Sequence, residues 1–214
     1  MEPLTLYVDG FWNSPYAFAA FVTLTEKGLP FSTREVNLHE RAQFAPAFQD
    51  RSVTGRVPVL EHGDFRLSES SAIVEYLEEV FAPPDHPAVL PASARERARA
   101  RQIMAWIRSD LMALREERPT SSIFYDPIKT PLSEAGQAAA RKLIAVASAF
   151  VPEGRASLFE RFTIADADLA MMLQRLLANG HDVPARLAAF AEAQWRRPSV
   201  RAFVDRKRPT FVPY

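Results

Sequence analysis

The sequence predicts an α/β domain followed by an all-helical domain, and three observations support this fold class. Strand-like runs occur only in roughly the first third of the chain, the proline-rich stretch "APPDHPAVLPAS" ends that pattern, and the apolar segments after it have helical spacing. A chain of 214 residues is also long enough for two cores. We therefore predict an α/β domain at 1–82, a stiff linker at 83–92 and an all-α domain at 93–214.

The first forty residues predict a strand, a helix and a second strand. "LTLYV" is a short β-prone run, "PYAFAAFVTLTEKG" keeps apolar residues through about four helical turns, and "FSTREVNL" alternates as a strand. Gly28 and Pro30 end the helix. The two strands should be parallel, with a right-handed crossover between them.

The next segment predicts a hairpin and a helix. "RVPVLEHGDFRL" contains two short strands joined by a turn at 62–64, and "SESSAIVEYLEEVF" has apolar residues at helical spacing. The order βαβ and then ββα is the thioredoxin-like arrangement.

The rest of the chain predicts helices. "SARERARARQIMAWIRSDLMALREER" indicates one helix of about seven turns. Shorter helices are expected at 133–150, 164–179, 183–196 and 198–206.

Composition and charge exclude several function classes. Lysine plus arginine equals aspartate plus glutamate, 26 against 26, so no net field favours nucleic acid or anionic lipid. The start of the chain has no leader pattern and no apolar run approaches about eighteen residues, so we expect a cytoplasmic protein away from the membrane. The chain has no cysteine, and its four histidines are far apart, so neither a thiol nucleophile nor a metal site is expected.

Ser14 directly precedes Pro15 where the first helical pattern begins. Serine at the N-cap with proline at the first helical position is good helix-start chemistry and needs no other explanation. This helix nevertheless begins at the carboxyl end of a parallel strand, where open α/β sheets bind ligands and where a helix dipole favours an anion.

Val57 precedes Pro58 at the start of a short strand. A turn or an edge strand would account for the proline. In a thioredoxin-like domain the same position carries a cis-proline, and the backbone of the residue before it can pair with a peptide.

"LSESSAI" opens the helix after the hairpin. Serine and glutamate in a first helical turn are explained by capping alone. Glu69 beside the Ser70 hydroxyl and free N–H groups could also hold the ammonium and carboxylate of an amino acid.

Together these features describe sites for a thiol, a peptide backbone and an amino-acid head. Glutathione contains all three groups. The sequence resembles the glutathione transferase family through "SPYAF", "RVPVLE" and "LSESSAIVEYLEE", in that order and spacing, over nearly the whole chain. It is most similar to the bacterial YfcF-type transferases through "ARARQIMAWIRSDLMALREERPT". The resemblance implies a thioredoxin-like domain, an all-α domain and glutathione as co-substrate.

The resemblance places Ser14 where the family contacts the glutathione sulfur. Relatives with cysteine there form mixed disulfides, whereas a serine without a nearby base is expected to donate a hydrogen bond and lower the pKa of the bound thiol. Asn13 and Tyr16 are secondary candidates for this role. Arg56 is expected to bind the glycine carboxylate, and His39 and Arg41 are alternatives to it.

The second substrate is expected between the domains. The side chains assigned to its pocket are Phe11, Trp12, Ile107 and Leu111, with Met104, Phe124 and Tyr125 as further candidates. Apolar residues at helical spacing usually pack in the core, so a core role is the alternative.

"FTIADADLA" matches the family's capping motif. Thr163 and Asp166 have the Ser/Thr-x-x-Asp spacing of a capping box at the start of an apolar helix. We therefore assign Asp166 to capping and folding, not to catalysis.

The main hypothesis is a transferase that conjugates the glutathione thiolate to small electrophiles. Glutathione-dependent reduction of peroxides or disulfides at the same site is an alternative, as is a non-catalytic interaction module with the same fold. The family resemblance also implies a homodimer.

Overall fold

The computed structural model describes residues 2–213, which form two compact units. The first unit ends at Val89 and is rejoined by the chain from Ala202 onward, and the second unit is Leu90–Arg201. The segment from Ala202 onward, which is expected in the helical domain from the sequence, packs with the first unit. Helical periodicity reports that a segment is helical and not which core it joins.

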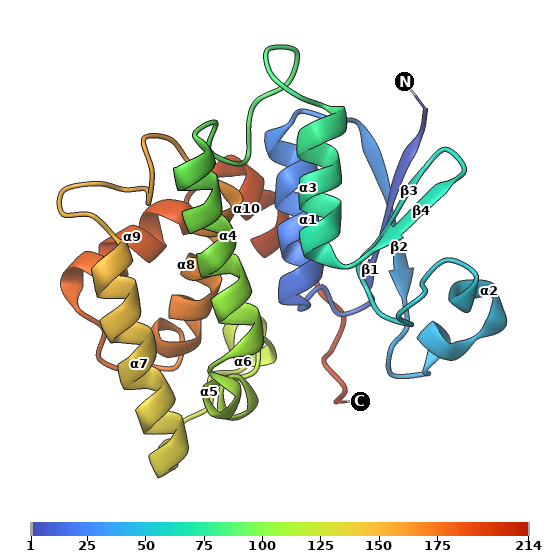
Figure 1. Ribbon diagram of the computed structural model, residues 1–214. Helices are drawn as coiled ribbons and strands as arrows, with labels where there is room; N and C mark the ends of the chain where they lie inside the picture. Colours follow the sequence, from blue (N-terminus) through green and yellow to red (C-terminus); the bar gives the residue numbers. More distant parts are fainter. Residues whose placement is uncertain (1, 214) are drawn as a thin grey trace. The chain divides into compact units, whose positions relative to one another are not determined.

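The first unit has the predicted thioredoxin-like fold. Its sheet has the strand order β2-β1-β3-β4, in which β1 and β2 are parallel and the other pairs are antiparallel. Helices α1 and α3 lie side by side on one face of the sheet, and α2 lies on the other (Figure 1). The elements are β1 Leu4–Asp9, α1 Pro15–Glu26, β2 Phe31–Val36, a 3₁₀ turn Ala42–Phe44, α2 Pro46–Gln49, β3 Val59–His62, β4 Phe65–Ser68 and α3 Ser70–Val80.

The register of the sheet brings three chain segments to one edge. Asp9, the last residue of β1, pairs with Val36, while Tyr7 pairs with Val59 at the start of β3. Val59 in turn pairs with Ser68 at the end of β4. The loop after β1, the residues before β3 and the start of α3 therefore all lie at the same edge of the sheet.

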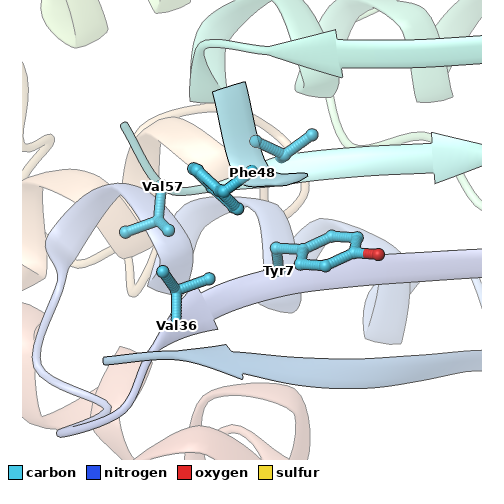
Figure 2. Close-up of a cluster of buried hydrophobic side chains, with 5 residues drawn as sticks. Tyr7, Val36, Phe48 and Val57 are labelled. Atoms are coloured by element: carbon cyan, nitrogen blue, oxygen red, sulfur yellow. The ribbon is translucent and has the colours of Figure 1, made fainter. Parts of the chain in front are cut away.

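A buried cluster supports this edge from the α2 side. The cluster consists of Tyr7, Val36, Phe48, Val57 and Val59. Figure 2 shows the side chains of Val57, Phe48 and Val36 close together, with the Tyr7 hydroxyl directed away from them. That hydroxyl donates to the carboxylate of Glu61 at 2.9 Å, so the ring is buried while its polar tip has a partner.

The second unit is helical. Its central helix α8 is buried along almost its whole length and packs against α4 and α9. The helices are α4 Ala94–Ser109, α5 Met112–Glu117, α6 Ser121–Phe124, α7 Glu134–Phe150, α8 Ile164–Leu177 and α9 Ala185–Trp195. Helix α10, Pro198–Val204, begins in this unit and ends in the first.

The prediction of one long helix over 93–118 is wrong. The helix is interrupted between α4 and α5, where Leu111 has a left-handed φ of 63°. The Asp110 carboxylate accepts hydrogen bonds from the Leu111 N–H at 2.7 Å and from Trp106 Nε1 at 3.0 Å, and it pairs with Lys142 of α7. An aspartate that bonds to local backbone N–H groups competes with the helical hydrogen bonds, and the lysine that holds it is distant in the sequence.

The capping role of Asp166 is confirmed. Thr163 and Asp166 form a reciprocal capping box at the start of α8. The Asp166 carboxylate is fully buried and accepts from the Thr163 N–H and hydroxyl, each at 2.8 Å, and from the Leu158 N–H at 2.6 Å. Burial raises the pKa of Asp166 to about 6, against the opposing effect of these hydrogen bonds.

No helix within residues 2–213 is both long and apolar enough to cross a membrane.

Candidate active site

Ser14 is the N-cap of α1. Its backbone is extended, and its Oγ accepts a hydrogen bond from the Ala17 N–H at 3.2 Å. A serine hydroxyl has one proton and two acceptor positions, so this bond leaves its proton free to donate elsewhere. The Ser14 side chain is partly exposed, whereas the neighbouring Asn13 is only 5% exposed. Of these two candidates, Ser14 is therefore the more accessible to a ligand.

The loop that carries Ser14 is held by a buried carboxylate. Asp9 is fully buried, its Oδ2 accepts from the Asn13 N–H at 2.8 Å, and its Oδ1 accepts from the Ser14 N–H at 3.0 Å. Burial raises the pKa of Asp9, and the hydrogen bonds and the charge of Arg208 oppose that rise. These two N–H groups are therefore satisfied within the chain and do not face a ligand.

The segment before β3 is ordered by a serine. The Ser52 hydroxyl donates to the Arg56 carbonyl at 2.9 Å and accepts from the Arg56 N–H at 3.0 Å. The Val57–Pro58 peptide bond is cis. Within residues 2–213, the hydrogen bonds outside helices and strands include none from the Val57 N–H or C=O. An N–H and a C=O group that make no such bond, beside a sheet edge, can pair with the backbone of a bound peptide.

Glu69 has an unusual backbone conformation at the start of α3. Its φ is 73° and its ψ is 114°, and its side chain is exposed with no capping hydrogen bond. Ser70, by contrast, is only 4% exposed. A non-glycine residue with positive φ costs free energy, and such residues concentrate at functional sites. The Glu69 carboxylate does not cap α3, so helix capping does not explain this strained conformation.

The remaining candidates for the glycine carboxylate differ in their contacts. The Arg56 side chain is exposed. The Arg41 guanidinium lies 5.2 Å from the centre of the Phe44 ring, and His39 Nδ1 lies 3.2 Å from the Pro213 carbonyl oxygen. Arg41 and His39 thus have contacts of their own, which favours Arg56 among the three.

The residues assigned to the second-substrate pocket are buried. Phe11, Trp12, Ile107 and Leu111 are 9%, 2%, 5% and 2% exposed. Trp12 packs edge-on against Phe21 and Phe203 in the first unit, and its Nε1 donates to the Glu35 carboxylate at 2.6 Å. These contacts favour a core role for Trp12, and the pocket assignment stays a prediction.

Sequence reasoning missed Asp9. The residue follows a β-prone run and precedes a glycine, so it matches an ordinary turn. Its spacing of four and five residues before Asn13 and Ser14 was the available signal, because aspartate side chains often bond to nearby backbone N–H groups.

The first unit thus has a thioredoxin-like sheet with a capped helix, a cis-proline and a strained glutamate at one edge, and a helical unit follows it. These features define a protein with the glutathione transferase fold. Family models agree in both parts of the chain: the glutathione S-transferase N-terminal domain matches residues 13–80, and the C-terminal domain matches residues 93–207. The chain belongs to the glutathione S-transferase family.

Solved structures and curated sequences show the extent of the similarity. A glutathione transferase homologue from Burkholderia, solved with bound glutathione, is 45% identical, with 95% of this chain and 97% of that chain covered and a TM-score of 0.80. The theta class enzyme of Xanthomonas axonopodis pv. citri shares the fold at 24% identity and a TM-score of 0.74, over 97% of this chain and 99% of that one. Glutathione S-transferase U22 of Arabidopsis thaliana is 36% identical over 91 residues, which are 42% of this chain and 40% of that protein. The chain therefore aligns with less than half the length of that curated relative.

Proposed function

We propose that this protein is a glutathione transferase that conjugates the thiolate of bound glutathione to small electrophiles. The observation that carries the proposal is the Ser14 hydroxyl, which accepts the Ala17 N–H and retains a proton to donate. Donation to a sulfur favours its ionised form and lowers the thiol pKa. The attacking sulfur belongs to the co-substrate, since the chain has no cysteine.

The same edge of the sheet provides the other contacts that glutathione needs. The Val57 backbone would pair with the cysteinyl group, Glu69 and Ser70 would hold the γ-glutamyl head, and Arg56 would bind the glycine carboxylate. Sheet register supports this grouping, because it brings the end of β1, the start of β3 and the end of β4 to one edge. Family membership and the Burkholderia homologue with bound glutathione support glutathione as the ligand.

Three parallel assays test the proposal. Purified protein with glutathione is offered an aryl halide, an organic hydroperoxide or a small mixed disulfide. We expect turnover with the aryl halide above that with the other two substrates. Turnover dominated by the hydroperoxide or the disulfide would instead favour the reductase alternative, and failure to bind glutathione in calorimetry would refute both.

We further propose a YfcF-type, cytoplasmic enzyme that acts as a homodimer in detoxification or in the response to oxidative stress. The 45% identity to a bacterial homologue over nearly the whole chain supports a bacterial-type enzyme. Light scattering coupled to size-exclusion chromatography tests the dimer, for which the expected mass is twice the 24.0 kDa of the chain.

A further inference from the structure

Three consecutive N–H groups of the loop before α1 are directed to one residue. The Trp12 N–H donates to the Asp9 carbonyl at 3.1 Å, and the Asn13 and Ser14 N–H groups donate to the two oxygens of the Asp9 carboxylate. The loop needs this support because Trp12 has a positive φ of 52°, a conformation that non-glycine residues rarely adopt. Asp9 thus determines both the path of the loop and the orientation of the Ser14 backbone.

Residues 206–211 also contact this loop. Arg208 Nε donates to the Trp12 carbonyl at 3.1 Å, while its two terminal nitrogens bond to carbonyls at the end of α10. The Arg206 guanidinium lies 3.7 Å from the centre of the Trp12 ring, and the Phe211 ring packs edge-on against Phe11 at 5.3 Å. Residues about two hundred positions apart in the sequence are therefore neighbours here.

We propose that Asp9 is a positioning residue for Ser14, and that Arg208 supports the same loop through the Trp12 carbonyl. The inference rests on the proposed function, since Ser14 acts on the sulfur of bound glutathione. Because the Asp9 side chain is fully buried and both its oxygens accept loop N–H groups, we assign it an action through Ser14 and not on the substrate itself. It fixes the N–H groups of Asn13 and Ser14, which lie on the N-terminal side of the Ser14 Cα, and this fixes the direction in which the hydroxyl donates.

A positioning role and a purely electrostatic role of Asp9 predict opposite changes in the pKa of the bound thiol when Asp9 is replaced. A carboxylate near the sulfur would raise the thiol pKa by repulsion, so removal of its charge would lower that pKa. Loss of a positioning residue instead removes the Ser14 donor and raises the thiol pKa. The charged groups that bear on this comparison are Arg208, near the Asp9 carboxylate, and Glu35 and Arg206, which contact the Trp12 side chain.

The test is Asp9→Asn, whose amide cannot accept both N–H groups. Four quantities are measured: kcat, the dissociation constant of glutathione by calorimetry, the pKa of the bound thiol from thiolate absorbance, and hydrogen exchange at the Asn13 and Ser14 amides. We expect kcat at neutral pH to fall at least tenfold, the dissociation constant to change less than about threefold, the thiol pKa to rise by about one unit and the two amides to lose protection. Asp64→Asn, at an exposed turn, is the matched control and should change none of them.

Hydrogen exchange requires no glutathione, so it tests the support of the loop by Asp9 separately from the proposed transferase function. If the wild-type protein does not bind glutathione, the proposed function fails, and unchanged amide protection in Asp9→Asn would still overturn the support of the loop by Asp9. A folded Asp9→Asn with unchanged kcat, or with a lowered thiol pKa, overturns the positioning role. If Asp9→Asn does not fold, Arg208→Gln replaces it and should lower kcat at least threefold with glutathione affinity retained; unchanged kcat would overturn the proposal.

Discussion

At the scale of single residues, the cap that Ser14 makes is compatible with the proposed contact to the glutathione sulfur, because the two use different parts of the hydroxyl. Its oxygen caps α1 by accepting the Ala17 N–H, and its proton remains available to a ligand. Glu69 differs from Ser14, because its side chain does not cap its helix and its backbone has a costly φ of 73°. Each residue leads to a separate prediction.

Ser14→Ala should lower turnover at neutral pH more than it lowers glutathione affinity. Loss of a hydrogen bond to a charged sulfur costs about 1.5 to 3 kcal/mol, which is roughly a ten- to hundredfold effect. The pKa of the bound thiol should rise, as measured by thiolate absorbance against pH. Ser14→Thr keeps the hydroxyl and should retain most activity, so an equal loss in both variants would contradict the donor role.

Ser14→Cys should form a mixed disulfide with glutathione under oxidising conditions. A thiol at a helix N-terminus ionises readily, and the native chain has no other cysteine. Mass spectrometry should therefore detect a single glutathionyl adduct that a reductant removes. Absence of the adduct in a folded variant that binds glutathione would mean that residue 14 does not face the sulfur.

Glu69→Gly and Glu69→Ala should weaken glutathione binding alike but differ in stability. Both remove the carboxylate, while only glycine adopts a φ of 73° without steric cost. We expect calorimetry to report a loss of affinity of about tenfold or more in both. Thermal unfolding should show Glu69→Gly to be more stable than Glu69→Ala by about 1 kcal/mol. Equal stabilities would argue against strain at this position.

At the scale of elements, helix ends determine where the chain changes direction. Asp110 ends α4 and Asp166 begins α8, and both do so through carboxylate bonds to backbone N–H groups. Asp110 is near the surface, and the hydrogen bond from Lys142 lowers its pKa, whereas burial raises the pKa of Asp166. The same residue type therefore contributes differently to stability at the two sites.

Asp166→Ala should lower the free energy of unfolding by about 2 kcal/mol or more at pH 7, because three buried donors lose their acceptor. The loss should increase as the pH is lowered. The pKa of Asp166 is about 6 in the folded protein and near 3.8 in the unfolded chain, so between these values only the folded state keeps the proton. Stability from this group is thus highest below pH 4 and falls as the pH rises toward 6.

Urea unfolding at pH 5 and pH 7 tests the predicted pH dependence of the stability that Asp166 contributes. The difference between the wild-type protein and Asp166→Ala should be larger at pH 5, by about 1 kcal/mol. A difference that shrinks at pH 5 would mean that the carboxylate is ionised more easily in the folded state. A stable variant without activity would instead move Asp166 into the active site.

At the scale of the whole molecule, a buried ion pair anchors the proline-rich segment that leads out of the first unit. Lys27 Nζ lies 2.7 Å from Glu78 Oε2 and donates to the carbonyls of Phe81 and Pro87. Glu78 also accepts from the Val89 N–H at 3.1 Å. The side chains of Lys27 and Glu78 are 0% and 3% exposed, so the segment is held by groups that water does not reach.

Glu78→Gln should destabilise the protein by about 3 to 5 kcal/mol, because it leaves the Lys27 ammonium buried without a counter-charge. Adding Lys27→Met to this variant should recover part of the loss, since the buried charge is then gone. Denaturant unfolding of the two single variants and the double variant measures the coupling. Glu79→Gln, at an exposed position on the same helix, serves as the control. Additive losses in the cycle would contradict a direct interaction.

Spacing within short windows was enough to predict the strands and helices α1 and α3 of the first unit, its thioredoxin-like sheet and the capping role of Asp166, but not the break between α4 and α5. The contact of Lys142 with Asp110, and the contacts of Asp9 and Arg208 with the loop before Ser14, are evident only in the folded chain. Such contacts join distant residues or depend on a backbone path that composition does not report. The glutathione roles of Arg56, Val57, Glu69 and Ser70 follow from family resemblance and sheet register, and they stay predictions. A side chain's neighbours are determined by packing, and packing is a property of the folded chain as a whole.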